Sequence, residues 1–276
     1  TSLDSYVSVL MMENKVVTKK VLERAGISVP GGYEYTSPEA GMADYRLYAG
    51  KPVVIKPKST NFGLGITILK HNYDETDFKA ALQIAFEHDN TVLIEKFIPG
   101  REFRIFIIND EVVGILHRVP ANVTGDGVLN IGQLIDMKNE DPLRGKGYRT
   151  PLEKIRKGRE EEMFLKQQGM DFNTVPKERE VVYLRENSNI STGGDSIDFT
   201  DDIDDSYKAI AVEAAKALNV KITGLDMMIQ DIHAPATPDN YAIIEMNFNP
   251  AIHIHCYPFK GKNRHLNHKM IKALGF

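Results

Sequence analysis

Two apolar runs joined by a very short connection constrain the fold more than any other feature of the chain. The runs "EFRIFIIND" and "EVVGILHRV" flank Asn109-Asp110-Glu111. Runs rich in β-branched and aromatic residues are typical of strands, and an Asn-Asp connection of this length is typical of a hairpin. Segments 51–57 and 66–70 flank a glycine-containing turn and predict a second hairpin. We therefore expect antiparallel or mixed sheets.

Helical patterns alternate with these strands. They cover residues 13–25, 74–89, 204–219 and 261–276. Apolar residues recur at helical spacing in the first two segments: Val16, Val17, Val21 and Leu22 in one, and Phe78, Leu82 and Phe86 in the other. Further strands are expected at 91–100, "ITGLDMMIQDI" and "YAIIEMNFNP", and short helices and surface loops across 121–180. The alternation predicts an α+β fold with helices joining the sheets.

Composition restricts the class of protein. The chain has 276 residues, of which 42% are hydrophobic, so it can bury a core as one large or two small domains. A net charge of −4 without long basic runs does not suggest a nucleic-acid partner, and no run approaches the roughly 18 apolar residues of a membrane span. Because Cys256 is the single cysteine, we expect a reducing, cytoplasmic location. The chain lacks a signal peptide and begins without Met, so we expect a piece of a longer protein.

The last two strands predict a metal site. Asp226 lies within "GLDMMI", and Glu245 and Asn247 lie within "IIEMNFN". Residues two apart on a strand share a face, so Glu245 and Asn247 point the same way and Asp226 can meet them from a neighbouring strand. Carboxylate and amide oxygens at the ends of apolar strands suit Mg²⁺. The alternative is a pair of edge carboxylates that face water.

Soft ligands nearby offer a zinc alternative. They are His253, His255, Cys256, His265 and His268. Structural zinc sites typically use pairs of ligands separated by two or more residues, often in a CxxC arrangement, and this chain has one cysteine. Magnesium is therefore favoured. His253 and His255 are expected to line a polar pocket beside the metal and bind a substrate carboxylate, or simply to pack.

Two stretches suggest a nucleotide site. In "VVIKPKSTNFGLG", Lys56 ends an apolar strand and residues 59–65 form a turn whose backbone N–H groups could cover a phosphate, although the order is not that of a Walker A motif. A solvated hairpin explains this segment equally well. In "LIEKFIPGREF", residues 95–98 offer an apolar slot with main-chain groups for adenine, and Glu102 offers a carboxylate for ribose. A strand end with surface charges is the alternative.

Basic residues recur near these strands at Arg104, Arg118, Arg185 and Arg264. A site that binds a triphosphate and a carboxylate needs several cations. Each arginine alone is more often a surface residue.

Taken in order, these motifs resemble the ATP-grasp superfamily of carboxylate–amine ligases. The matching pieces are "NK" at 14–15, "VVIKP" with the glycine loop at 53–65, "LIEKFIPGREFR" at 93–104, "GLD" at 224–226 and "IIEMNFNP" at 243–250. The resemblance implies two α+β subdomains that clamp ATP between antiparallel or mixed sheets. It places an N-terminal linker and helix at 1–30, a first subdomain with the glycine loop at 31–98, and a second with the metal and substrate site at 99–276.

Further segments look like the ATP-grasp portions of bacterial bifunctional glutamate–cysteine ligase/glutathione synthetases and of cyanophycin synthetases. These are "GDGVLNIGQLI", "NEDPLRGKG" and "VVYLRENSNISTGGDSIDFTDDI". The bifunctional enzymes are the closer match, because cyanophycin synthetases are expected to continue into a Mur-ligase-like domain and this chain ends at "IKALGF". The resemblance implies a covalently attached glutamate–cysteine ligase domain outside this piece, with a homodimer common among relatives and no membrane partner.

The resemblance assigns roles by matching position. Residues implied to hold ATP are Lys15 and Lys56 at the phosphates, Ser59, Gly63 and Gly65 in the covering loop, Glu95, Lys96, Phe97 and Ile98 at adenine, and Glu102 at ribose. Asp226, Glu245 and Asn247 are implied to bind two Mg²⁺ or Mn²⁺ ions. Substrate or phosphate contacts are implied for Asn187, Asn189, Ser191, Thr192, His253, His255 and Arg264. In D-alanine–D-alanine ligases an arginine often precedes the metal-binding Asp by two positions, where this chain has Gly224. Arg104, Arg118 and Arg185 are therefore the candidates to stabilise the transferred phosphate.

The activity implied is ATP-dependent ligation of γ-glutamylcysteine and glycine to glutathione through an acyl phosphate, with release of ADP and phosphate. One alternative keeps the fold and changes the substrates, as in cyanophycin-type addition of an amino acid to a polypeptide. Another is a nucleotide-binding module that does not catalyse.

Overall fold

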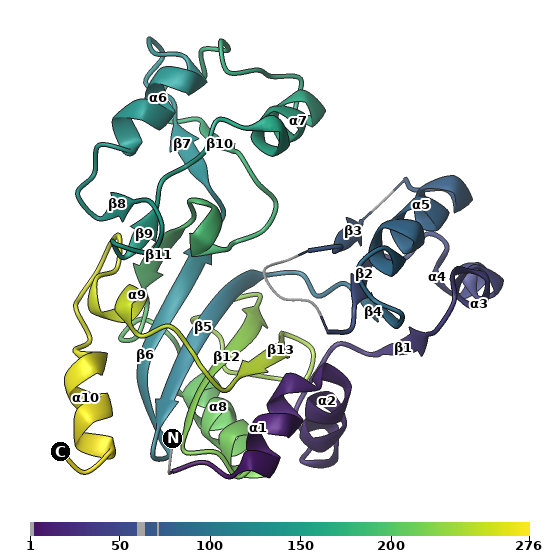
Figure 1. The fold of residues 1–276 in the computed structure, drawn as a ribbon, viewed down its shortest axis with the longest axis vertical. Coiled ribbons are helices and arrows are strands. Elements are labelled where there is room, and N and C mark those ends of the chain that lie inside the picture. Colours follow the sequence, from purple (N-terminus) through teal and green to yellow (C-terminus); the bar gives the residue numbers. More distant parts are fainter. Residues whose placement is uncertain (1–2, 60–63, 71) are drawn as a thin grey trace. The chain divides into compact units, whose positions relative to one another are not determined.

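The computed structural model describes residues 3–59, 64–70 and 72–276. Its helices are α1 (Tyr6–Glu13), α2 (Lys15–Arg24), α3 (Pro38–Ala43), α4 (Tyr45–Tyr48), α5 (Glu75–Phe86), α6 (Ile131–Lys138), α7 (Arg159–Gln167), the 3₁₀ turn η1 (Ile190–Thr192), α8 (Asp205–Ala217), α9 (His253–Cys256) and α10 (Leu266–Ala273) (Figure 1). Its strands are β1 (Gly32–Tyr35), β2 (Val53–Pro57), β3 (Thr67–Leu69), β4 (Val92–Lys96), β5 (Arg101–Ile108), β6 (Glu111–Val119), β7 (Asn122–Thr124), β8 (Arg144–Gly145), β9 (Leu152–Glu153), β10 (Val181–Tyr183), β11 (Asp195–Asp198), β12 (Ile222–Ile229) and β13 (Tyr241–Asn247). Among the described residues, no helix is long and apolar enough to cross a membrane.

The chain folds into two compact units. Unit 1 contains Thr1–Arg101, Ile105–Val112 and Asp202–Pro250, and unit 2 contains Glu102–Arg104, Val113–Asp201 and Ala251–Phe276. In the described residues, one sheet has the strand order β1-β4-β2-β3 and another has the order β11-β6-β5-β12-β13. The α+β class with antiparallel sheets is confirmed.

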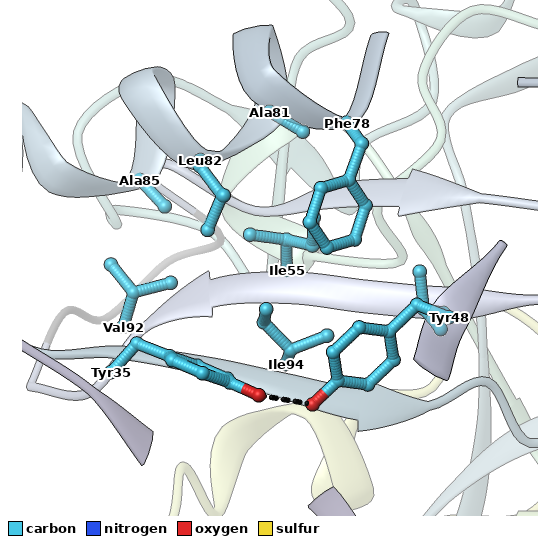
Figure 2. Packing of buried hydrophobic residues seen from close by; sticks show 10 residues of the cluster. Tyr35, Tyr48, Ile55, Phe78, Ala81, Leu82, Ala85, Val92 and Ile94 are labelled. Carbon is cyan, nitrogen blue, oxygen red and sulfur yellow. Dashed lines mark hydrogen bonds between the residues drawn. The ribbon is translucent and has the colours of Figure 1, made fainter. Parts of the chain in front are cut away.

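The sheet β1-β4-β2-β3 of unit 1 packs its apolar face against α5. Its β1–β4, β2–β4 and β2–β3 pairings are antiparallel, and the predicted hairpin is confirmed by the register of Val53 with Leu69. Phe78 and Leu82 are fully buried against the sheet, as the helical spacing predicted. Figure 2 shows this core, in which the hydroxyl groups of Tyr35 and Tyr48 lie 2.7 Å apart.

Helices α1 and α2 of unit 1 meet at Asn14. The Asn14 backbone N–H caps the end of α1, and its side chain accepts hydrogen bonds from the backbone N–H groups of Val16 and Val17, which starts α2. The predicted helix at 13–25 is therefore α2, with an unpredicted α1 before it. Not every apolar residue at helical spacing is buried, because Val17 is 37% exposed. The residues that α2 buries are Thr18, Lys19 and Leu22.

The predicted hairpin at residues 101–119 is confirmed by β5 and β6, which are neighbours in their sheet. Asn109 and Asp110 connect them with φ values of 49° and 67°. A turn with both central residues at positive φ matches the twist of a hairpin, and Asn and Asp tolerate that conformation better than most residues.

Unit 2 holds the polar middle of the chain. Its antiparallel pairs are β6 with β11 and β7 with β10, and β8 pairs with β9 in parallel. The predicted short helices at 121–180 are confirmed as α6 and α7. Ile131, Leu134 and Ile135 of α6 pack into an apolar cluster with Val123 and Val182 from β7 and β10.

Candidate nucleotide and metal site

Strands β12 and β13 of unit 1 bring the predicted metal donors together. Asp226 lies directly opposite Glu245 in the antiparallel register, and Asn247 lies opposite Gly224. The register shifts between Asp226 and Met227, and such a bulge re-aims the side chains beside it. The Asp226 side chain is buried, whereas Glu245 and Asn247 are partly exposed. The predicted proximity is confirmed, and the metal-binding role stays a prediction.

The donors fit a hard cation. Among the described residues, the buried Nδ2 atom of Asn247 has no hydrogen-bond partner. Rotation of the amide exchanges Nδ2 with Oδ1, which would add an oxygen to the two carboxylates. Mg²⁺ accepts a few protein oxygens and completes its octahedron with water and phosphate. The proposed site has two carboxylates and one amide. In the part of the chain that the structure describes, no group of three or more His, Cys, Asp or Glu side chains is arranged to hold a metal ion.

Two lysines of unit 1 pair with Glu95 of β4, and the charge of Glu95 also acts on a third, Lys15. Lys56 of β2 places Nζ 2.8 Å from Oε2 of Glu95, and Lys19 of α2 pairs with Oε1. Burial lowers the pKa of Lys15, which lies one turn before Lys19. The charges of Glu245 and Glu95 raise it, but each of these effects is smaller than that of burial. Burial raises the pKa of Glu95, and the charges of Lys56 and Lys19 outweigh this effect, so the carboxylate stays ionised.

Lys19 is absent from the set predicted by the sequence. The apolar pattern of α2 contains the valines and not Lys19. Lys19 follows Lys15 by four residues, which is one helical turn on the same face. That spacing places Lys19 on the same helix face as Lys15, but it does not reveal the pairing of Lys19 with Glu95.

The other predicted nucleotide contacts follow β2 and β4. The backbone N–H of Ser59 donates to Asp89, and Phe97 donates to Pro52. Gly65 has a φ of +72°, and a Cβ there would lie 2.7 Å from Pro57, so a side chain would not fit. Lys96 is exposed and Ile98 is half-buried at the end of β4. Gly63 lies outside the described residues.

In unit 2, the predicted ribose and phosphate residues are held by ion pairs. Glu102 pairs with Arg118 and accepts a 2.6 Å hydrogen bond from the Ser188 hydroxyl. Arg185 pairs with Glu160 and Glu161 in the first turn of α7. These contacts fix where Arg118 and Arg185 lie. Arg104 is buried in β5, with 9% of its surface exposed.

The loop "NSNISTGG" of unit 2 is tied together by its own side chains. The Thr192 hydroxyl lies 2.9 Å from both the Asn187 side-chain oxygen and the Asn189 carbonyl. Gly193 then takes a φ of +93°, where a Cβ would lie 2.8 Å from the Ile155 backbone. Ser191 is half-buried in η1. The substrate role of this loop stays a prediction.

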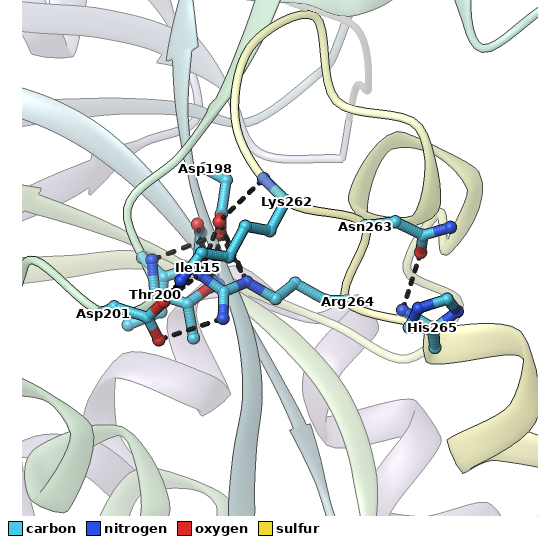
Figure 3. A network of polar contacts seen from close by, with 8 residues as sticks. All are labelled: Ile115, Asp198, Thr200, Asp201, Lys262, Asn263, Arg264 and His265. Carbon is cyan, nitrogen blue, oxygen red and sulfur yellow. Dashed lines mark hydrogen bonds and ion pairs between the residues drawn. The ribbon is translucent and has the colours of Figure 1, made fainter.

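Arg264 of unit 2 is engaged with two aspartates (Figure 3). Its guanidinium group binds Asp198 of β11 through Nε and Nη2 and Asp201 through Nη1 and Nη2. These bonds connect the segment before α10 to the end of β11 and to the residues just after it. His253 is exposed at the start of α9, whereas His255 is fully buried, and burial with the nearby charge of Arg104 lowers the pKa of His255 to about 3. Its ring is therefore neutral.

The chain is similar to known proteins in both sequence and structure. Residues 34–133 match the family model described as "D-ala D-ala ligase C-terminus". The chain is 63% identical over all its residues to the bifunctional glutathione biosynthesis protein GshAB of Desulfotalea psychrophila, and it spans 35% of that relative's length. A bifunctional glutathione synthetase from Pasteurella multocida has a solved structure that matches at 50% identity and a TM-score of 0.75, over 99% of this chain and 38% of that one.

A more distant structure shares the fold alone. The ATP-grasp ligase PsnB, solved with a precursor variant, Mg and ADP, matches with a TM-score of 0.53 at 16% identity, over 98% of this chain and 61% of that one.

The fold and these matches place the chain among the ATP-grasp ligases. Within that class, it corresponds over its whole length to the C-terminal synthetase part of the bifunctional glutathione biosynthesis proteins.

Proposed function

We propose that this chain ligates γ-glutamylcysteine and glycine to glutathione at the expense of ATP, and that ADP and phosphate are released. The observation that carries the proposal is 63% identity over the whole chain to a bifunctional glutathione biosynthesis protein. The arrangement of lysines and acidic residues in unit 1 supports a nucleotide and metal site of the kind this reaction needs.

The proposed nucleotide residues act by charge. Lys15 and Lys56 bind phosphate oxygens, Lys96, Phe97 and Ile98 hold adenine together with Glu95, and Glu102 holds ribose. Asp226, Glu245 and Asn247 hold two Mg²⁺ or Mn²⁺ ions, which when bound offset the charge of the triphosphate. No protein nucleophile is needed, because the substrate carboxylate itself attacks the γ-phosphate.

The remaining proposed residues handle the substrates. The carboxylate of the cysteine residue in γ-glutamylcysteine takes the γ-phosphate, and the glycine amine then attacks the acyl phosphate and displaces phosphate. Arg104, Arg118 and Arg185 are the cations proposed to stabilise the transferred phosphoryl group, and the loop 187–192 with His253, His255 and Arg264 is proposed to bind substrate. Water must be excluded, because acyl phosphates hydrolyse.

The proposal extends to the longer protein. The chain spans 35% of the relative with which it shares 63% identity. We propose that a covalently attached glutamate–cysteine ligase domain supplies γ-glutamylcysteine, that the protein works in the cytoplasm, and that it forms a homodimer.

A phosphate-release assay on the purified chain tests the activity. With Mg·ATP, we expect phosphate release that requires both γ-glutamylcysteine and glycine, and glutathione detectable by mass spectrometry. Omission of either substrate is the control. Release with aspartate and a cyanophycin primer, and none with γ-glutamylcysteine and glycine, would replace this proposal with the polypeptide-extending alternative. ATP binding without release under any condition would support a non-catalytic module.

A further inference from the structure

A buried triple of charged side chains lies on three elements of unit 1. Glu95 of β4 is 4% exposed, Lys56 of β2 is 7% exposed, and Lys19 of α2 is 9% exposed. One carboxylate oxygen of Glu95 pairs with Lys19, and the other lies 2.8 Å from Nζ of Lys56. Because each oxygen has its own lysine, the carboxylate cannot rotate without losing an ion pair.

Stability alone does not explain the triple. Burying charges costs several kcal/mol per ion, and apolar residues often replace buried ion pairs without loss. The three elements that contribute the triple also carry the proposed nucleotide residues: Lys15 on α2, Lys56 on β2 and Glu95 itself on β4. The triple is therefore better explained by a role at the nucleotide site.

The net charge of the triple gives Lys19 and Lys56 different roles. A lysine paired alone with Glu95 would form a neutral couple with little attraction for phosphate. With Lys19 present, two cations share one anion, so the triple keeps a net charge of +1. Glu95 occupies one of the three N–H donors of Lys56, which leaves donors for phosphate oxygens.

We propose that Lys19 is a positioning residue of the nucleotide site. It holds the Glu95 carboxylate and offsets its charge, so that Lys56 lies in a fixed place and keeps its attraction for a nucleotide phosphate. The inference rests on the proposed function only in taking ATP as the ligand. Burial lowers the pKa of Lys19 to about 8, and the charge of Glu95 opposes this effect. The charged form of Lys19 is therefore favoured by the Glu95 carboxylate.

The test compares two neighbouring lysines of α2 in the full chain. Lys19→Met removes the charge at similar length, and Lys20→Met does the same at an exposed position. Calorimetric titration with Mg·ATP alone measures the dissociation constant, and steady-state assays measure KM for ATP, KM for glycine and kcat. We expect Lys19→Met to weaken ATP binding roughly 10- to 100-fold, as for loss of a charge-assisted bond. We expect KM for glycine to stay unchanged and Lys20→Met to match the wild type.

Two further variants keep the test decisive. If Lys19→Met does not fold, Lys19→Gln keeps a hydrogen-bond donor without the charge, and we expect a dissociation constant for ATP about 10-fold higher. Lys19→Arg restores the charge and is expected to recover part of the affinity. A folded, neutral variant at position 19 that binds Mg·ATP as tightly as the wild type would overturn the inference, as would a loss confined to kcat.

The titration also separates this inference from the proposed function. If the wild type binds Mg·ATP and forms no glutathione, the proposed reaction fails while the role of Lys19 is still measured. If the wild type binds no Mg·ATP, both are overturned.

Discussion

Glu245 and Asn247 lie two residues apart on β13, and Asp226 lies opposite Glu245 on β12. If they hold the metal, Glu245→Ala or Asn247→Ala should lower kcat by roughly 100-fold or more, because the charge of the reacting phosphate is no longer offset. Binding of ATP should weaken less, because Lys15 and Lys56 remain. Steady-state kinetics and calorimetric titration measure the two effects. Glu111→Ala, at an exposed position, is the control. Unchanged turnover in Glu245→Ala and in Asn247→Ala would refute the metal assignment.

The pKa of Lys19 predicts how ATP binding depends on pH. Lys19 faces Lys15 on its own helix, Lys56 on β2 and Glu95 on β4, and burial together with Lys56 lowers its pKa from 10.5 to about 8. Lys19 is therefore charged below that pKa and loses its charge as pH rises through it. We expect ATP affinity to fall between about pH 7 and pH 9, one unit on either side of the pKa. Titrations should give a flatter profile for Lys19→Met, and equal slopes would contradict the assignment.

Asp195 anchors a second buried charge cluster, in unit 2. It pairs with Lys138 and with Arg144, whose side chain is fully buried, and it accepts a hydrogen bond from Asn122. These ion pairs connect β11 to α6 and to β8, so the cluster stabilises the fold. Asp195→Ala should lower the free energy of unfolding by about 3–5 kcal/mol, because two buried cations lose their anion. Urea denaturation measures it, with Asp136→Ala at the exposed pair with Lys157 as a control that changes little.

At the residue scale, the shared face of the proposed metal donors on β13 could be predicted because a strand's period of two is a local property. Asp226, Glu245 and Asn247 stand out as polar residues inside apolar runs. Lys19 could not be found in this way. Lys19 is buried together with its partner Glu95, which is 76 residues away in the chain. Helical spacing alone cannot reveal that partner.

The pairing of β1 with β4 depends on a glycine. Gly32 lies opposite Glu95 in the register, and a Cβ on Gly32 would lie 2.2 Å from the Ile94 carbonyl oxygen. Because backbone atoms block that Cβ, Gly32→Ala should push β1 from β4 and destabilise unit 1 by about 1–3 kcal/mol. We also expect weaker ATP binding, since Glu95 would shift. Gly31→Ala is the matched control, because nothing lies within 4 Å of its Cβ. Equal stability of the two variants would argue against this close packing.

At the element scale, segments with a clear period or turn signal were predictable, and several segments without one were not. α5 and the β5–β6 hairpin follow from clear periodicity and a strong turn. α1 was missed because its sequence, "YVSVLMME", is apolar on every side and shows no helical period. β1, α3 and α4 are too short for a pattern, so their conformation depends on contacts with the rest of unit 1.

At the scale of the whole molecule, the proposed roles divide between the units. The proposed phosphate lysines and metal donors belong to unit 1, whereas the proposed substrate residues and the three candidate arginines belong to unit 2. The segments of the two units alternate along the chain. Which segment belongs to which unit depends on contacts between residues far apart in the sequence, and local sequence patterns do not reveal those contacts. The predicted limits at 30 and 98 stay a prediction for this reason.

Ligand binding should stabilise the folded chain by mass action. A ligand that binds only the native state raises the free energy of unfolding by about 2.7 kcal/mol at a concentration 100 times its dissociation constant. We expect Mg·ATP to raise the thermal midpoint accordingly. If Asp226, Glu245 and Asn247 hold the metal, ATP with EDTA should raise it less, because the metal is then removed. Differential scanning fluorimetry measures both shifts. In Glu245→Ala the two conditions should converge. An equally large difference between Mg·ATP and ATP with EDTA in that variant would place the metal elsewhere in the chain.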